Sequence, residues 1–350
     1  MEHSEETIEK RKERVLFFLK QKKEWIYYIV LLGIVYVGFY VRTLNISKLK
    51  DITTNDWALA PDLDPYLFLR WAKYIVEHGM LMAHDAMRYV PVGYDTAGEM
   101  KLLAYMMAWF YEVFHFFDNS ISVTYAAIWF PVAMFVFTAI AFFLFARKIF
   151  YMEESETRNI IALIATAFFV LVPSWLPRSI AGIPEKESVA FGFMFLAFYL
   201  YLEATTSEKL RNKMILGVFS GISTALMALT WGGVIFVFFS IPTAFFLAFL
   251  LGNVKRDETI VYALWLISSF ALMIPFSTRY SIQNLVVSTS TLLAMGVFFL
   301  VLTSLLLMKS EKIENIRKNK KIPREIFYAF LSAFILIILI SAVLDRKSVV

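Results

Sequence analysis

The chain has 350 residues, of which 59% are hydrophobic, 17% aromatic and only 18% charged. This balance excludes an ordinary soluble domain and predicts a polytopic membrane protein, because several apolar runs are long enough to cross a bilayer. The formal net charge of +5 comes from bases in short loops between these runs, so no nucleic-acid partner is expected, and the absence of cysteine excludes a disulfide framework.

The first predicted element is a basic leader, residues 1–23, and the apolar run after it lacks the small-residue cleavage site of a signal peptide. Together with this leader, residues 1–350 are expected to form one all-α membrane domain with about nine spans. The expected spans are residues 25–41, 122–146, 159–175, 188–202, 214–230, 232–250, 259–276, 285–308 and 327–344.

The basic loops predict the orientation of these spans. With the leader in the cytoplasm, the basic loops 146–158, 205–213, 252–258 and 309–325 all share its side, as the positive-inside rule requires. The external face then receives a long first loop, residues 42–121, and a short second loop, residues 177–187. Residues 100–117 are interpreted as an interfacial helix, because a further span there would move every later basic loop to the outside.

The expected spans contain no Asp, Lys, Arg or His within their apolar stretches. Proton relays and ion pathways usually need such residues inside the bundle, so a coupled transporter is disfavoured. The polar residues that are placed for chemistry lie in the two external loops instead. Three of them, His78, His84 and Asp85, lack another partner at ligand spacing and are interpreted as solvated loop residues.

The first external loop contains the stretch "DLDPY", in which Asp62 and Asp64 lie two residues apart. An aspartate followed by Pro65 is a common way to begin a helix, so capping alone is one interpretation of Asp64. Capping does not account for Asp62. This cluster is therefore a candidate functional site as well as a helix start.

The second external loop contains "RSIAGIPEKE", with Glu185 and Glu187 at the mouth of the fourth expected span. Acidic groups in a first helical turn also complement the helix dipole, which is the simpler interpretation. Two carboxylates at this spacing can, however, offer oxygen atoms to one hard cation. Arg178, seven residues before Glu185, is close enough in a short loop to pair with a carboxylate or an anionic leaving group, although arginines at span ends are ordinary.

The order of these features resembles the membrane domain of the catalytic subunit of oligosaccharyltransferase, the enzyme that moves a lipid-linked glycan onto asparagine. That family has a D-P-Y motif in its first external loop and R-[ST]-x-[AS]-G-x-x-acidic-x-acidic in its second, which read here as "DLDPY" and "RSIAGIPEKE". The stretches "RYVPVG" at residues 88–93 and "TWGG" at residues 230–233 resemble further family motifs. The resemblance implies a GT-C-type glycosyltransferase fold, with interfacial helices in the first external loop.

The resemblance also implies that Asp64, Glu185 and Glu187 bind a catalytic divalent metal, Mg²⁺ or Mn²⁺, since both ions prefer oxygen ligands. It implies that Arg178 orients these carboxylates or meets the lipid phosphate. The family usually has Asp at the position of Glu185, so the longer side chain changes the reach of this ligand.

Two further residues are weaker candidates, Asp62 and Trp231. Asp62 is the other half of the first acidic pair. Trp231 follows the family's W-G-G motif, but an interfacial aromatic residue is the simpler interpretation of it.

The implied partners are a polyprenyl- or dolichyl-linked glycan donor, an acceptor polypeptide and the lipid bilayer. The expected location is an integral, multi-pass position in a membrane, which is the cell membrane if the source is prokaryotic, with an archaeon favoured and with the active site on the external face. The family also has a later catalytic glutamate and a C-terminal soluble domain with a W-W-D motif. We expect that domain to be absent from these 350 residues. The chain is then either the front portion of a longer protein or a naturally shortened relative.

Two alternatives remain open. A polyprenyl-phosphate sugar transferase acting on a lipid-linked glycan also has an acidic pair in its first external loop, although "RSIAGIPEKE" favours the oligosaccharyltransferase. A non-catalytic membrane scaffold or flippase would use both acidic clusters as helix caps, and the lack of polar residues aligned within the spans disfavours a flippase.

Overall fold

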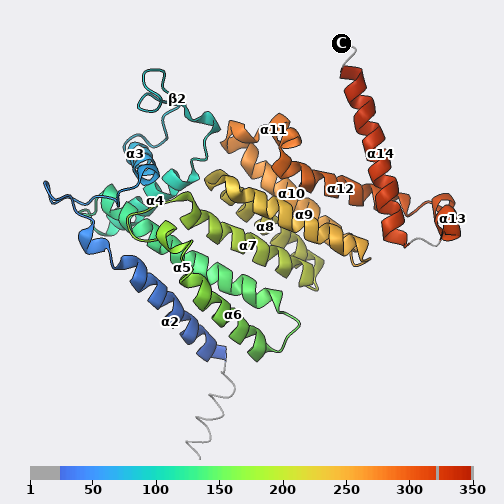
Figure 1. Ribbon diagram of the computed structural model, residues 1–350, viewed down its shortest axis with the longest axis horizontal. Coiled ribbons are helices and arrows are strands. Elements are labelled where there is room, and N and C mark those ends of the chain that lie inside the picture. Colours follow the sequence, from blue (N-terminus) through green and yellow to red (C-terminus); the bar gives the residue numbers. More distant parts are fainter. Residues whose placement is uncertain (1–23, 321–322, 348–350) are drawn as a thin grey trace, which may run out of the picture. The chain divides into compact units, whose positions relative to one another are not determined.

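The computed structural model describes residues 24–320 and 323–347, and helices account for most of this part of the chain (Figure 1). A short antiparallel hairpin, made of β1 (His84–Asp85) and β2 (Tyr94–Asp95), interrupts the helical pattern. The predicted all-α fold is confirmed apart from this hairpin. The predicted cytoplasmic leader, residues 1–23, lies outside the described residues.

The chain forms two compact units. The first unit comprises Met1–Leu69 and Phe110–Ser188, and the second comprises Arg70–Trp109 and Val189–Val350. Three helices pass from one unit into the other, namely α3 (Leu63–His78), α4 (Leu102–Phe117) and α7 (Lys186–Thr206).

The first unit is built on α2 (Glu24–Thr43), α5 (Val123–Ile149) and α6 (Ser155–Val170), which pack against one another. Aromatic side chains fill the contacts, as where the rings of Phe142 and Phe169 stack with centroids 4.2 Å apart. The short elements of this unit are η1 (Ile46–Lys48) and η3 (Leu176–Arg178).

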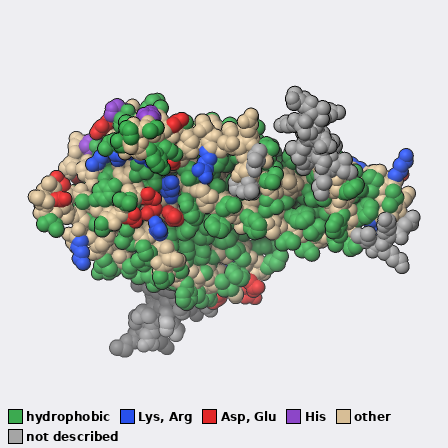
Figure 2. All heavy atoms as spheres, turned by 45° about the horizontal axis from the view of Figure 1, so that its top comes forward, with side chains coloured by type: hydrophobic (Ala, Val, Ile, Leu, Met, Phe, Trp, Pro, Cys, Tyr) green, Lys and Arg blue, Asp and Glu red, His purple; other side chains and the backbone are tan. Residues whose placement is uncertain are grey.

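Large apolar side chains remain exposed on α2, among them Trp25, Ile29, Leu32 and Tyr36. Hydrophobic side chains also cover much of the face shown in Figure 2. Such a surface is costly in water and suits contact with lipid chains, which is the environment that the composition predicts.

The second unit contains α8 (Leu210–Thr230), α9 (Ile235–Leu250), α10 (Arg256–Phe276), α12 (Thr289–Leu307) and α14 (Arg324–Lys347). Helices α8 and α10 approach closely because Gly221 has no side chain, and a Cβ there would lie 1.9 Å from the Ser268 Oγ. Helix α12 packs on both α9 and α14. The short elements of this unit are η2 (Thr96–Gly98), η4 (Gly232–Val234), η5 (Thr278–Tyr280), α11 (Ile282–Val287) and α13 (Glu311–Lys320).

Six helices of the described residues are long and apolar enough to cross a membrane, and the number is seven if α12 and α13, bent by 93°, form one span. All nine predicted spans fall on helices, but the number nine itself stays a prediction. The predicted span 159–175 was drawn too long, because α6 ends at Val170, shortly before Pro173, and a proline disfavours helical backbone at the residue before it. The predicted span 285–308 is interrupted at Ser288, between α11 and α12.

The predicted interfacial helix of residues 100–117 is present as α4. Its 16 residues correspond to about 24 Å at ~1.5 Å per residue, which is less than the ~30 Å of a bilayer core. This length suits a helix that does not span the membrane, and its interfacial position stays a prediction.

Candidate active site

The loop of residues 177–187, which is predicted to be external, is held in the first unit by hydrogen bonds to residues of α5 and to the end of α2. The Ala181 N–H donates to the carbonyl of Arg42 at 2.9 Å, and the Gly182 N–H donates to the carbonyl of Ile128 at 3.0 Å. The Asn45 side-chain amide donates to the Ala181 carbonyl at 2.8 Å. These bonds connect the loop to the end of α2 and to α5, so its course is determined by the helix packing.

Gly182 is required at the centre of this loop for two reasons. Its φ of +80° lies in the left-handed region that side chains disfavour. A Cβ atom there would also lie 2.6 Å from the Leu49 Cδ1 and 3.2 Å from the Ala60 nitrogen. The glycine of "RSIAGIPEKE" therefore allows the first loop to approach the second.

The first acidic cluster is joined to the second loop at this point. The Ala60 N–H donates to the Gly182 carbonyl at 3.1 Å, and the Asp62 N–H donates to the Ala60 carbonyl at 2.8 Å. Helix α3 begins at Leu63, two residues before the expected start at Pro65, so Asp64 lies in the first turn of the helix and is not its N-cap. Asp62 and Asp64 are both exposed.

The second acidic cluster is centred on Glu185, whose side chain is only 5% exposed. The Arg178 Nη1 donates to its Oε1 at 3.0 Å, and the Arg178 side chain is half exposed. Glu185 directly precedes α7, and Ser188 lies in its first turn. The Ser188 hydroxyl donates to the Glu185 carbonyl at 2.6 Å. Glu187 is half-buried in the first turn of that helix.

The negative charges of both acidic clusters act on the carboxyl group of Glu185. Burial raises the pKa of the Glu185 carboxyl, and the negative charges of Glu187, Asp62 and Asp64 raise it further, while Arg178 lowers it. Burial is the largest cause of the raised pKa, and Arg178 offsets only part of the increase. The structure therefore brings together five of the predicted site residues in one electrostatic cluster.

Carboxylate oxygens are the ligands that a hard divalent cation prefers, and the carboxylates whose charges act on Glu185 outnumber the one arginine beside it. Within the part of the chain that the structure describes, no three His, Cys, Asp or Glu side chains are drawn together closely enough to hold a metal ion. The predicted ligand set of Asp64, Glu185 and Glu187 stays a prediction.

Trp231 lies in the second unit, between α8 and η4. Its ring is 5.6 Å from the ring of Phe191 and 6.4 Å from that of Phe236, measured between centroids. A Cβ on Gly233 would lie 1.9 Å from this indole ring, so the W-G-G sequence allows the backbone to pass close to the tryptophan. Packing accounts for these features of Trp231.

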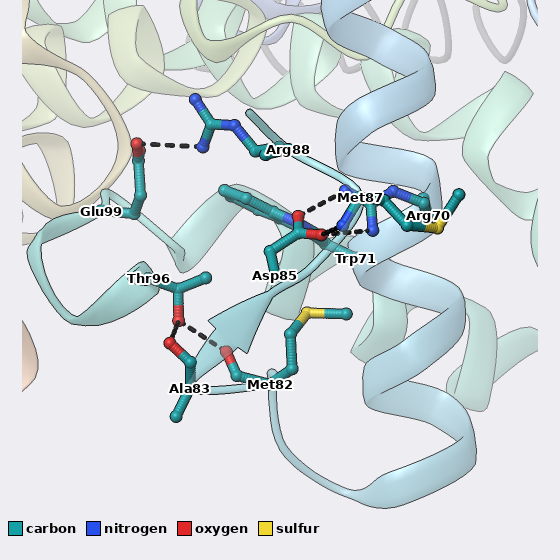
Figure 3. A network of polar contacts seen from close by, with 9 residues as sticks. All are labelled: Arg70, Trp71, Met82, Ala83, Asp85, Met87, Arg88, Thr96 and Glu99. Carbon is teal, nitrogen blue, oxygen red and sulfur yellow. Dashed lines mark hydrogen bonds and ion pairs between the residues drawn. The ribbon is translucent and has the colours of Figure 1, made fainter. Parts of the chain in front are cut away.

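The interpretation of Asp85 as a solvated residue is wrong, because only 1% of its surface is exposed. Figure 3 shows its carboxylate beside Arg70 and Trp71. Its carboxylate accepts hydrogen bonds from both terminal nitrogens of Arg70, including one of 2.8 Å from Nη1, from the Trp71 Nε1 at 3.0 Å and from the Met87 N–H at 3.1 Å. The Arg70 guanidinium holds the pKa of Asp85 down at about 2. His78 and His84 are exposed, as expected.

A second ion pair stabilises the same part of the first external loop. The Arg88 Nη1 lies 3.2 Å from the Glu99 Oε1, which also accepts a 2.6 Å hydrogen bond from the Tyr94 hydroxyl. The Arg88 guanidinium carbon lies 4.0 Å from the centroid of the Tyr94 ring. The stretch "RYVPVG" thus begins with a residue that fixes the hairpin.

The family model for oligosaccharyl transferase STT3, N-terminal, matches residues 52–301, which is more than half of the chain. The chain belongs to this family. The family resemblance that the motifs indicate is therefore confirmed.

Among its STT3 relatives, the dolichyl-diphosphooligosaccharide–protein glycosyltransferase subunit STT3 of Dictyostelium discoideum is 23% identical over 296 residues, covering 81% of this chain and 37% of the relative. The chain thus spans about two fifths of the length of this STT3 protein.

Two solved structures of Archaeoglobus fulgidus oligosaccharyltransferase share the fold. AglB in complex with an inhibitory peptide and a dolichol-phosphate matches with a TM-score of 0.70 and 20% identity, covering 93% of this chain and 38% of AglB. A complex with Zn and sulfate matches with a TM-score of 0.67 and 19% identity, over 90% of this chain and 40% of the neighbour. The expected GT-C-type fold is confirmed by these matches.

Proposed function

We propose that this STT3-family chain carries the carboxylate site of a membrane glycosyltransferase that moves a glycan from a polyprenyl (di)phosphate carrier to asparagine of an acceptor protein. The observation that carries the proposal is the backbone bond from Ala60 to Gly182, which joins the loop of Asp62 and Asp64 to the loop of Arg178 and the buried Glu185. The D. discoideum relative is named for glycan transfer from a dolichyl diphosphate to protein, and AglB was solved with a dolichol-phosphate and a peptide. These names support a lipid-linked donor and a polypeptide acceptor.

In this proposal Asp64, Glu185 and Glu187 hold a divalent cation, Mg²⁺ or Mn²⁺. The presence of Zn with the A. fulgidus protein supports a divalent cation at a site of this kind. When bound, the cation would polarise the acceptor and offset negative charge on the departing phosphate. The family's usual Asp is replaced here by Glu185, whose burial and bond to Arg178 restrict the longer side chain.

Arg178 has two roles in the proposed reaction. Its bond to the Glu185 Oε1 fixes the direction of that carboxylate. Because a guanidinium has five N–H donors and the side chain is half exposed, donors not used by Glu185 can meet an anionic phosphate oxygen. The same residue would thus orient a ligand carboxylate and stabilise the leaving group.

We place this site on the external face of a prokaryotic cell membrane, in an archaeon by preference. The support is the distribution of bases in the sequence, which assigns loops 42–121 and 177–187 to the side opposite the basic loops. A lipid-linked donor would meet the carboxylates at headgroup depth, beside the apolar helices that surround the site.

Activity of two isosteric variants tests the proposal. In the full protein reconstituted into vesicles, Asp64→Asn and Glu187→Gln should each reduce transfer of a polyprenyl-linked glycan to an Asn-X-Thr peptide by roughly 100-fold, because an amide keeps the shape but loses the charge that holds a divalent ion. Chelation should silence the parent protein, and added Mn²⁺ should partly restore the variants.

Asp56→Asn is the matched control, since Asp56 is an exposed aspartate of the same loop and should tolerate the change. Full activity of Asp64→Asn would contradict the proposed site. Transfer to a lipid-linked glycan in place of the peptide would support the alternative, a polyprenyl-phosphate sugar transferase.

A further inference from the structure

Arg42 is a fully buried arginine in the last turn of α2, with 0% of its surface exposed. No carboxylate among the described residues forms an ion pair with it. A buried cation without a counter-ion is costly unless hydrogen bonds replace its water shell. The contacts of Arg42 therefore indicate what this position is built to do.

The guanidinium of Arg42 bonds the second external loop directly. Its Nε donates to the Ser179 Oγ at 2.9 Å, and Ser179 is itself fully buried. Its Nη1 donates to the carbonyl of Val170, the last residue of α6, at 3.0 Å, and to the carbonyl of Gly38 at 3.1 Å. The side chain thus joins α2, the end of α6 and the loop that follows it.

Aromatic rings hold the same guanidinium in place. Its carbon lies 3.8 Å from the centroid of the Phe135 ring on α5 and 4.9 Å from that of Trp175 in the loop. Both rings are almost fully buried, so this cation–π attraction acts away from water. The Arg42 backbone adds a further bond, because its carbonyl accepts the Ala181 N–H at 2.9 Å.

These contacts determine the direction of Arg178. The Ser179 hydroxyl is bound to Arg42 and donates to the Trp175 carbonyl at 3.0 Å, so Ser179 faces inward. The neighbouring Arg178 then has its side chain half exposed, with its Nη1 3.0 Å from the Glu185 Oε1. On the far side of Ser179, Ala181 is fixed by the Arg42 carbonyl and leads into Gly182, which bonds the Ala60 N–H that precedes the first acidic cluster.

We infer that Arg42 is a positioning residue, which holds the loop of residues 171–185 so that Arg178 and Glu185 face the first acidic cluster. It acts through Ser179 and Ala181 and touches neither substrate nor cation. Its consequence for catalysis rests on the proposed function, whereas its hold on the loop does not.

Hydrogen exchange of the loop tests this inference in the full protein in nanodiscs. Arg42→Lys keeps the charge but cannot reproduce the fork that reaches Ser179, Gly38 and Val170 together. Ser179→Ala keeps the arginine and removes the hydroxyl group that accepts from Arg42 and donates to the Trp175 carbonyl. Each variant should raise the exchange rate of peptides covering residues 171–185 at least tenfold and leave peptides of α5 and α6 unchanged.

Ser179→Thr is the matched conservative variant, since it keeps a hydroxyl group and "RSIAGIPEKE" belongs to a motif that allows Ser or Thr at this position. It should keep exchange in the loop near the rate of the parent protein. If Arg42→Lys does not fold, the pair of Ser179 variants decides the question, because both leave the arginine in place.

Mn²⁺ affinity, measured by electron paramagnetic resonance, is the second readout. Arg42→Lys and Ser179→Ala should weaken it about tenfold, as loss of supporting contacts does at other metal sites. A parent protein that binds no Mn²⁺ would contradict the proposed metal site, and loop exchange would still decide the role of Arg42. Unchanged loop exchange in both variants, or equal loosening of α5 and α6, would overturn the inference.

Discussion

Glu185 combines burial with a surplus of neighbouring negative charge, so its ionised form is disfavoured in the folded protein. Its folded pKa is raised above the ordinary value of 4.5, and the folded state therefore binds more protons than the unfolded state above that pH. Stability should fall as the pH rises from about 4.5 through the raised pKa. A bound cation would remove this penalty.

Glu185→Gln should consequently make the metal-free protein more stable at pH 7 and flatten the fall in stability with pH. The glutamine keeps an oxygen acceptor for Arg178 but carries no charge. Thermal unfolding in detergent, with and without Mn²⁺, measures both effects. The parent protein should gain more stability from Mn²⁺ than the variant does, because a ligand stabilises the state that binds it. A less stable variant in the absence of metal would mean that the bond to Arg178 outweighs the repulsion.

The contribution of Asp85 to stability depends on pH in the opposite direction. Its folded pKa of about 2 lies below the ordinary 3.8, so its contribution to stability is present above about 3.8 and is lost as the pH falls through about 2. Asp85→Asn leaves the Arg70 guanidinium without its anionic partner and should cost about 3 kcal/mol in the opening of residues 79–99.

Hydrogen exchange of the hairpin, read between pH 3 and pH 7 after correction for the intrinsic rate, measures this opening free energy in Asp85→Asn and in the parent. Glu77→Gln is the control, because Glu77 is exposed on α3 and should have little effect. Equal protection of the hairpin in Asp85→Asn and in the parent would show that the remaining contacts hold the loop without the ion pair.

Gly221 lies at the tightest glycine contact between α8 and α10. A Cβ at Gly221 would lie 1.9 Å from the Ser268 Oγ and 2.4 Å from the Trp265 carbonyl oxygen. Gly221→Ala should therefore push the two helices apart and destabilise the protein by roughly 1–3 kcal/mol, measured by the unfolding midpoint in micelles. Gly296→Ala in α12 is the control, since nothing lies within 4 Å of its Cβ position, and it should be neutral or slightly stabilising.

Hydropathy and proline were sufficient to predict the helices but not their ends or their polar contacts. The apolar runs predict α2, α5 and α7 to α10 within a few residues, because hydropathy reports directly on burial in lipid. The buried state of Asp85 could not be predicted, since its partner Arg70 lies in another element and reaches it only once the hairpin forms. The buried state of Arg42 could not be predicted either, because in the sequence it resembles any basic residue at the end of a span.

The acidic site was predictable in its residues but not in its support. The spacing of Asp62, Asp64, Glu185 and Glu187 indicates oxygen ligands, and the family motif indicates that the two pairs belong together. What joins them is a backbone bond from Ala60 to Gly182, and side-chain chemistry carries no signal for such a bond. Only Gly182 hints at it, because glycine is the residue that most readily adopts the left-handed backbone of this loop.

At the scale of the whole molecule, the family motifs divide between the two units. The stretches "DLDPY" and "RSIAGIPEKE" both lie in the first unit, although they are far apart in the sequence, and "RYVPVG" and "TWGG" lie in the second. The first unit thus contains every acidic residue proposed for the site. Its two loops can act together only if they lie on the same side of the membrane.

Labelling of single cysteines tests this requirement without background, because the chain has no cysteine of its own. Thr53→Cys reports on the first external loop and Ser174→Cys on the segment before Arg178, and both positions are exposed. Lys312→Cys, also exposed, reports on a loop that the positive-inside rule places in the cytoplasm.

In intact cells a membrane-impermeant maleimide should label Thr53→Cys and Ser174→Cys, and should label Lys312→Cys only after the cells are permeabilised. Transfer of a basic loop across the membrane is unfavourable, and four basic loops favour the same orientation, so the expected pattern does not depend on any single loop. Labelling of Lys312→Cys in intact cells would show that the predicted orientation is wrong, but it would not contradict the shared carboxylate site. Opposite accessibility of Thr53→Cys and Ser174→Cys would separate the two acidic clusters by the bilayer, and the shared carboxylate site would then be excluded.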